Sequence, residues 1–132
     1  MWIMVDPRSH TPMYQQIIDD IKTRIARGAM ASGSKLPSIR ELAMDITINP
    51  NTIAKAYQEL EREGVIEVIR GKGTFVASST PAEVRDSARR VVRDMLTRTL
   101  VEAHHLGVEF IDVGKELERL IADWNQAREG QA

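Results

Sequence analysis

The feature that most constrains this fold is a change of apolar periodicity close to residue 64. Residues 39–45 and 50–63 space their apolar side chains three and four positions apart, which predicts two helices that each bury one face. Residues 65–77 are instead rich in β-branched side chains around the turn-forming run 70–73, which predicts a β-hairpin with a basic tip. Two helices joined by a few residues and followed at once by a hairpin are typical of a winged helix-turn-helix.

Capping residues mark where both helices start. Ser38 stands three residues before Glu41, which is the spacing of a capping box for the helix over 39–45. Asn49 is predicted to cap the next helix, and Pro50 suits its first position because the N–H group that proline lacks has no helical partner there. The predicted buried faces of the two helices consist of Leu42, Ala43, Ile53, Ala56, Tyr57 and Leu60.

Two segments are predicted ahead of this pair of helices. Residues 1–6 alternate large apolar side chains, which predicts a short strand that Pro7 ends. Thr11 is predicted to cap an amphipathic helix over 12–27 in which Pro12 takes the first position. The apolar face of that helix consists of Tyr14, Ile17, Ile18, Ile21 and Ile25.

Residues 80–132 form a second segment with its own pattern. A capping box at 80–83 begins a helix that is predicted to run to about His105, and Gly107 breaks it. A further helix is predicted from the apolar positions at near-heptad spacing between 110 and 124.

The composition excludes several classes of protein. None of the 132 residues is a cysteine, which excludes a disulfide framework, a thiolate metal site and a cysteine nucleophile. No apolar run approaches the roughly 20 residues that a membrane-spanning helix needs, and the first residues lack the basic start of a signal peptide. We therefore expect a cytoplasmic protein that has no membrane partner.

The outward face of the helix over 50–63 indicates what this unit binds. At about 100° per residue, two amide side chains and two cationic side chains lie about 140° to 200° around the helix from the buried Ile53. These four residues are Asn51, Lys55, Gln58 and Arg62. The face offers amide and cationic donors without a carboxylate, which suits the major groove of DNA. A solvated polar face without a ligand is the alternative.

The fold class predicted from these elements is mainly α with a small β-hairpin. A winged helix-turn-helix DNA-binding domain is expected over residues 1–79, followed by a two-helix C-terminal dimerisation region over 80–132. The first segment carries 10 Lys+Arg and 9 Asp+Glu, and the second carries 8 and 10, so their net charges are +1 and −2. Such a chain is expected to bind non-specific DNA only modestly and to owe its specificity to paired contacts.

Three motifs resemble one family of regulators. They are Leu36-Pro37-Ser38-Ile39-Arg40-Glu41-Leu42-Ala43, Asn49-Pro50-Asn51-Thr52-Ile53 and Arg70-Gly71-Lys72-Gly73-Thr74-Phe75-Val76. Over residues 12–77 the chain resembles the GntR-type winged-helix transcriptional regulators, and its turn and short tail resemble the YtrA-like subfamily. The resemblance implies a homodimer that binds a double-stranded DNA operator, commonly as a repressor. Many branches carry an arginine at the position of Pro50 and a basic residue at Ala54, so those two contacts do not carry over.

The predicted DNA-contacting residues come from the pattern and the resemblance together. They are Ser38, Arg40, Asn49, Asn51, Thr52, Lys55, Gln58, Arg70, Gly71, Lys72 and Thr74. Arg40 is expected to read a guanine or clamp a phosphate, and its alternative is a surface ion pair with Glu41 or Asp45.

Three further residues keep alternative roles open. Asn51 is expected to read an adenine or else to bond its own backbone. Lys55 is expected to bind a phosphate or else to be an ordinary solvated lysine. Gly71 is expected to let the backbone approach DNA closely, or else to serve only the turn itself.

The two C-terminal helices need a partner, because about 50 residues cannot bury two apolar faces alone. A second copy related by a two-fold axis is the simplest partner, and it implies a near-palindromic operator. The predicted dimerisation residues are Val84, Ala88, Val91, Val92, Met95, Leu96, Leu100, Phe110, Leu117, Leu120, Ile121 and Trp124.

No cofactor and no metal are predicted. His104 and His105 are adjacent and diverge by about 100° on a helix, so they cannot chelate one ion together. The tail is too short for the separate effector domain of larger GntR relatives, and a small-molecule effector stays open. The alternatives to a DNA-binding regulator are a winged-helix protein-interaction module, which would favour exposed aromatic anchors, and an enzyme, for which no catalytic constellation is found.

Overall fold

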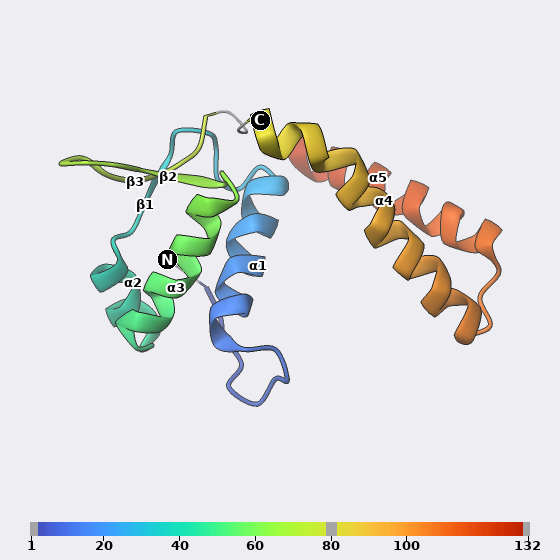
Figure 1. The fold of residues 1–132 in the computed structure, drawn as a ribbon, viewed down its shortest axis with the longest axis horizontal. Helices are drawn as coiled ribbons and strands as arrows, with labels where there is room; N and C mark the ends of the chain where they lie inside the picture. The colour runs from blue at the N-terminus through green and yellow to red at the C-terminus, as the bar shows by residue number, and fades with distance from the viewer. Residues whose placement is uncertain (1–2, 79–81, 131–132) are drawn as a thin grey trace. The chain divides into compact units, whose positions relative to one another are not determined.

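The computed structural model describes residues 3–78 and 82–130. The chain divides into two compact units, Met1–Thr80 and Pro81–Ala132 (Figure 1). Within the described ranges, no helix combines the length and the hydropathy that crossing a membrane requires.

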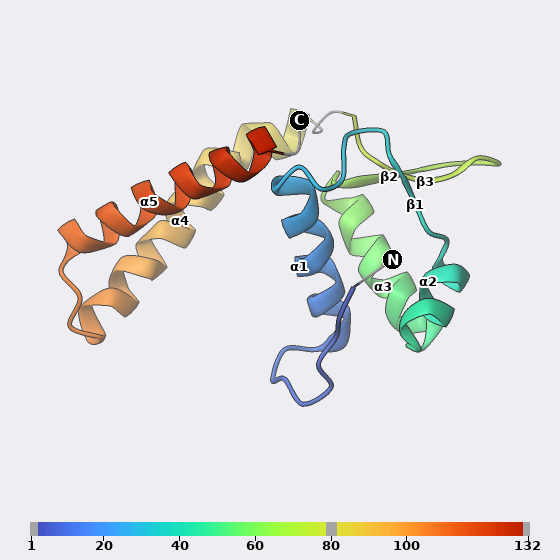
Figure 2. The same cartoon turned by 180° about the vertical axis from the view of Figure 1, so that it is seen from behind.

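Three helices form the body of the first unit. They are α1 at Met13–Ala26, α2 at Ile39–Ile46 and α3 at Pro50–Arg62. α1 and α3 lie side by side, and α2 packs against α3 (Figures 1 and 2). The buried faces predicted for α2 and α3 are confirmed, because all six residues predicted to form them are buried. The largest fully buried side chains of the core are Ile17, Ile18, Ile21, Leu42, Ile53, Leu60, Ile66 and Val76.

A three-stranded antiparallel sheet completes this unit. The predicted hairpin is confirmed as β2 at Ile66–Ile69 and β3 at Gly73–Val76. A third strand, β1 at Lys35–Leu36, pairs with β3, so the strand order is β1-β3-β2. The sequence pattern did not predict β1, because a strand of two residues is too short to show a period of two.

The predicted strand over residues 1–6 is wrong where the structure describes it. Residues 3–6 form no strand, and residues 1–2 lie outside the described ranges. The alternation has another cause: Ile3 is 4% exposed and belongs to the core, whereas Met4 is 89% exposed. An extended segment becomes a strand only when a neighbouring strand pairs with it.

The predicted start of the first helix is one residue early. Pro12 is the N-cap and makes no side-chain cap, so the predicted cap by Thr11 is wrong. The side chain of Gln16 orders this loop instead. Its Nε2 donates to the carbonyls of Thr11 at 2.8 Å and Asp6 at 2.9 Å, and its Oε1 accepts from the Asp6 N–H at 2.7 Å.

The second unit is a hairpin of two helices, α4 at Ala82–His105 and α5 at Phe110–Gly130 (Figure 2). Gly107 stands in the connection with a φ of 77°, a value that glycine adopts without strain. The predicted capping box at 80–83 includes residues 80 and 81, which lie outside the described ranges.

Most apolar side chains of this hairpin are not buried within the unit. Among the residues predicted to dimerise, the side chain of Val84 lies outside the description, and Leu100 and Trp124 are half-buried. The others are exposed: Ala88, Val91, Val92, Met95, Leu96, Phe110, Leu117, Leu120 and Ile121. The hairpin of α4 and α5 therefore presents an extensive apolar surface outside its own core.

Candidate nucleic-acid interface

Local hydrogen bonds cap the starts of both α2 and α3. The Ser38 Oγ accepts from the Glu41 N–H at 3.1 Å and caps α2, and the Asn49 Oδ1 accepts from the Asn51 N–H at 2.8 Å and caps α3. Thr47 ends α2 with a φ of 55°, in the left-handed region that non-glycine residues seldom adopt. Three residues thus redirect the chain from one helix to the next.

Tyr57 links the buried side of α3 to the start of α2. Its hydroxyl donates to the Pro37 carbonyl at 2.9 Å, and its ring belongs to the core. Burial raises the pKa of the Tyr57 hydroxyl above its ordinary range, and the negative charge of Glu41 raises it further. The hydrogen bond thus joins α3 to the residue that precedes the Ser38 cap of α2.

Replacing Tyr57 by phenylalanine is expected to lower the free energy of unfolding by about 1–2 kcal/mol, since the Pro37 carbonyl loses its donor. The loss should shrink above about pH 10, because there the wild-type hydroxyl ionises in the unfolded chain but not in the folded one. Urea unfolding at several pH values measures both effects. Tyr14→Phe is the control, and an equal loss in that variant would contradict this role of Tyr57.

The part of α3 over residues 50–58 presents an open polar face. Asn51, Lys55 and Gln58 are exposed, and Thr52 is half-buried beside them. Lys55 is not simply solvated, because its Nζ lies 3.8 Å from the centroid of the Tyr14 ring on α1. Such a cation–π contact is worth about 0.5–1 kcal/mol at an exposed site and restricts where the ammonium can reach.

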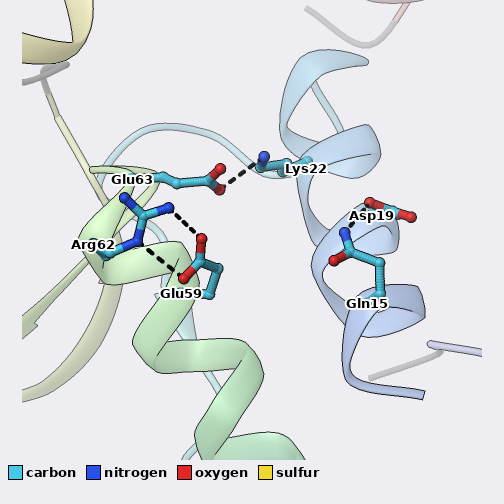
Figure 3. Close-up of polar contacts among 6 residues, drawn as sticks. All are labelled: Gln15, Asp19, Lys22, Glu59, Arg62 and Glu63. Atoms are coloured by element: carbon cyan, nitrogen blue, oxygen red, sulfur yellow. Dashed lines mark hydrogen bonds and ion pairs between the residues drawn. The ribbon is translucent and has the colours of Figure 1, made fainter. Parts of the chain in front are cut away.

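The C-terminal half of α3 differs from the sequence prediction. Arg62 is not an unpaired cation, because its guanidinium makes two hydrogen bonds to the Glu59 carboxylate one turn earlier (Figure 3). The hydrogen bond from Arg62 lowers the pKa of Glu59. Beside this pair, the Lys22 Nζ of α1 lies 2.8 Å from the Glu63 Oε2 (Figure 3). The open polar face therefore ends at Gln58, and the expected face without a carboxylate is wrong beyond that residue.

Arg40 stands exposed near the start of α2. Across residues 3–78 and 82–130, no hydrogen bond or ion pair engages its guanidinium, so the alternative of a pair with Glu41 or Asp45 is absent. Ser38 is also exposed, although its oxygen already serves the cap. A free planar guanidinium can bind a guanine edge or a phosphate through two hydrogen bonds.

The hairpin tip is a three-residue loop formed by Arg70, Gly71 and Lys72. It is closed by a hydrogen bond of 2.9 Å from the Lys72 N–H to the Ile69 carbonyl. Gly71 has a φ of 77°, so the turn alone requires glycine there. Arg70 and Lys72 are exposed, whereas Thr74 is half-buried on the face of the sheet that continues into the core.

α2 and the end of the β2–β3 hairpin lie on the same side of α3 (Figures 1 and 2). Most predicted contact residues therefore belong to three neighbouring elements of one unit. Lys35 was missed by the sequence reasoning, and β1 brings it beside the hairpin. Pairing of residues about 40 positions apart leaves no local pattern in a sequence.

A metal centre has no support in the described residues. Nowhere in them do three His, Cys, Asp or Glu side chains form a group that could hold an ion. The rings of His104 and His105 meet edge to face, with their centroids 5.4 Å apart.

Comparison with known proteins identifies the family to which this fold belongs. Residues 13–76 match the model of the bacterial regulatory proteins of the gntR family. The HTH-type transcriptional repressor YtrA of Bacillus subtilis is 42% identical over 121 residues, which cover 92% of this chain and 93% of that protein. The matched family and this relative are both transcriptional regulators by name.

Two solved structures extend the comparison. The crystal structure of a transcriptional antiterminator from Listeria monocytogenes shares 36% identity and a TM-score of 0.81, covering 94% of this chain and 92% of that one. The DNA-binding domain of AraR in complex with operator ORX1 shares 32% identity and a TM-score of 0.50, covering 56% and 92%. The chain is thus a transcriptional regulator that belongs to the gntR family and is of the YtrA type.

Proposed function

We propose that this regulator is a repressor that binds a near-palindromic operator as a homodimer. Residues 1–79 bind DNA, with α3 in the major groove and the hairpin as a wing on the adjacent groove or backbone. Residues 80–132 join two copies. The observation that carries the proposal is a set of exposed side-chain donors on neighbouring elements that no other described residue engages: Arg40 on α2, Asn51 and Gln58 on α3, and Arg70 and Lys72 at the hairpin tip.

The division of α3 into an open part and a paired end supports a specific way of docking. Residues 50–58 offer side-chain amides, which can form paired hydrogen bonds with adenine. At the C-terminal end Arg62 is paired with Glu59, and Glu63, the residue after the helix, is paired with Lys22 of α1. We therefore expect residues 50–58 of α3 to enter the groove while the C-terminal end stays against α1.

The exposed apolar side chains of α4 and α5 support the dimer. A two-helix unit of this size buries little of its own apolar surface, and a two-fold copy would cover the same patch on both chains. Binding to a chromosomal operator implies that the protein acts in the cytoplasm.

Selection of bound duplexes from a random pool, repeated at several salt concentrations, tests the function. The expected result is a consensus with two-fold symmetry whose half-site centres lie about one helical turn apart. Enrichment of an asymmetric single site would contradict the dimeric mode. Failure to enrich any sequence would favour a winged-helix protein-interaction module, and derepression of a reporter on deletion of the gene tests the repressor role.

A further inference from the structure

Lys35 lies on one face of the small sheet, and none of the sequence motifs above includes it. Lys35 on β1 and Glu67 on β2 both stand opposite Phe75 on β3, so these three side chains share one face. The opposite face contains the buried Leu36, Ile66 and Val76 and belongs to the core. Lys35 therefore lies on the side of the sheet that faces solvent, and it is exposed.

The side chain of Lys35 runs across the sheet to the base of the hairpin loop. A Cβ placed on Gly73 would lie 2.9 Å from the Lys35 Cε and 3.6 Å from its Nζ. The same position is 3.9 Å from the Phe75 ring, so Lys35 occupies the space that the missing side chain leaves beside that ring. Gly73 directly follows Lys72 and closes the loop opposite Ile69, which places the ammonium of Lys35 next to the tip.

The charge of Lys35 is available for a ligand. Within the described residues no ion pair or hydrogen bond engages its ammonium, although Glu67 lies on the same face. Glu67 is separated from Lys35 by the whole width of β3. The hairpin base thus adds one unpaired cation to the two at the tip.

We propose that Lys35 is the third cation of the wing and binds a DNA phosphate beside the contacts of Arg70 and Lys72. The inference rests on the proposed DNA-binding function. A phosphate fits better than a base edge, because an ammonium on an edge strand is a point charge that cannot offer two parallel hydrogen bonds. Gly73 has two roles in this arrangement: its φ of 130° shapes the strand, and its bare Cα leaves room for Lys35.

The test compares Lys35→Met and Lys35→Arg with the wild type on two duplexes, the selected operator and a mixed-sequence duplex of equal length. Methionine keeps an aliphatic chain against Phe75 and removes only the charge. Lys115→Met on α5 is the matched control, because it makes the same charge change at an exposed position of the other unit. Thermal unfolding of each variant verifies that the fold is kept.

For Lys35→Met, the slope of log affinity against log salt is expected to fall by about 0.9 for each bound protomer, equally on both duplexes. Lys35→Arg and Lys115→Met are expected to keep the wild-type slope. An unchanged slope in Lys35→Met overturns the inference and leaves the function intact. An equal loss in Lys35→Arg would assign the effect to packing and would also overturn it. If the wild type binds neither duplex, the proposed function fails and the inference falls with it.

Discussion

Arg40→Ala is expected to weaken binding to the selected operator by about 1–3 kcal/mol for each contact, a factor of roughly 5 to 150. The loss is expected because the Arg40 guanidinium is exposed and no protein group among the described residues competes for it. For the same reason, the free energy of unfolding should change by less than about 0.5 kcal/mol. Titration of operator and mixed duplexes by fluorescence anisotropy, with urea unfolding alongside, measures both quantities.

A companion variant separates the two roles open to Arg40. Arg40→Lys keeps the charge but loses the planar pair of donors. If Arg40 reads a guanine, the lysine variant should lose preference at one base position, whereas a phosphate clamp should lose affinity for all sequences alike. Arg119→Ala on α5 is the distal control. Wild-type operator affinity in Arg40→Ala would refute the central contact of the proposed interface.

Leu120→Glu is expected to convert the dimer into a monomer and to reduce operator binding toward the non-specific level, a loss of roughly a thousandfold or more. Leu120 is 52% exposed on α5. In a two-fold interface the substitution occurs twice. Each copy loses the roughly 1.5–3 kcal/mol of stabilisation that burial of a leucine side chain contributes, and it introduces a carboxylate into an apolar contact. Sedimentation at micromolar concentration and operator titration are the two measurements.

Gln126→Glu is the matched control for this variant. It adds the same charge to α5 at an exposed position about 120° around the helix from Leu120. We expect it to remain dimeric and to bind the operator normally. A Leu120→Glu variant that stays dimeric would show that the apolar surface of α4 and α5 does not join the copies. A monomer with wild-type affinity would show that the operator is read without pairing.

The sequence by itself predicted the parts of the fold that depend on neighbouring residues. The caps by Ser38 and Asn49, the buried faces of α2 and α3, and the hairpin with glycines in its turn all rest on contacts a few residues apart. Helix periodicity and turn residues can be recognised within a few consecutive residues of a sequence. The motif residues Arg40 and Lys72 could be named in advance for the same reason, because each stands at a fixed offset from a cap or a turn.

Only the tertiary structure decided which distant residues meet. It paired β1 with β3, and so placed Lys35 beside Gly73 at the wing. It set Lys55 over the Tyr14 ring, and Lys22 against Glu63. It also left residues 3–6 without a strand partner. Each of these outcomes depends on packing between segments far apart in the chain, where the free energy comes from the shared core and not from any local pattern.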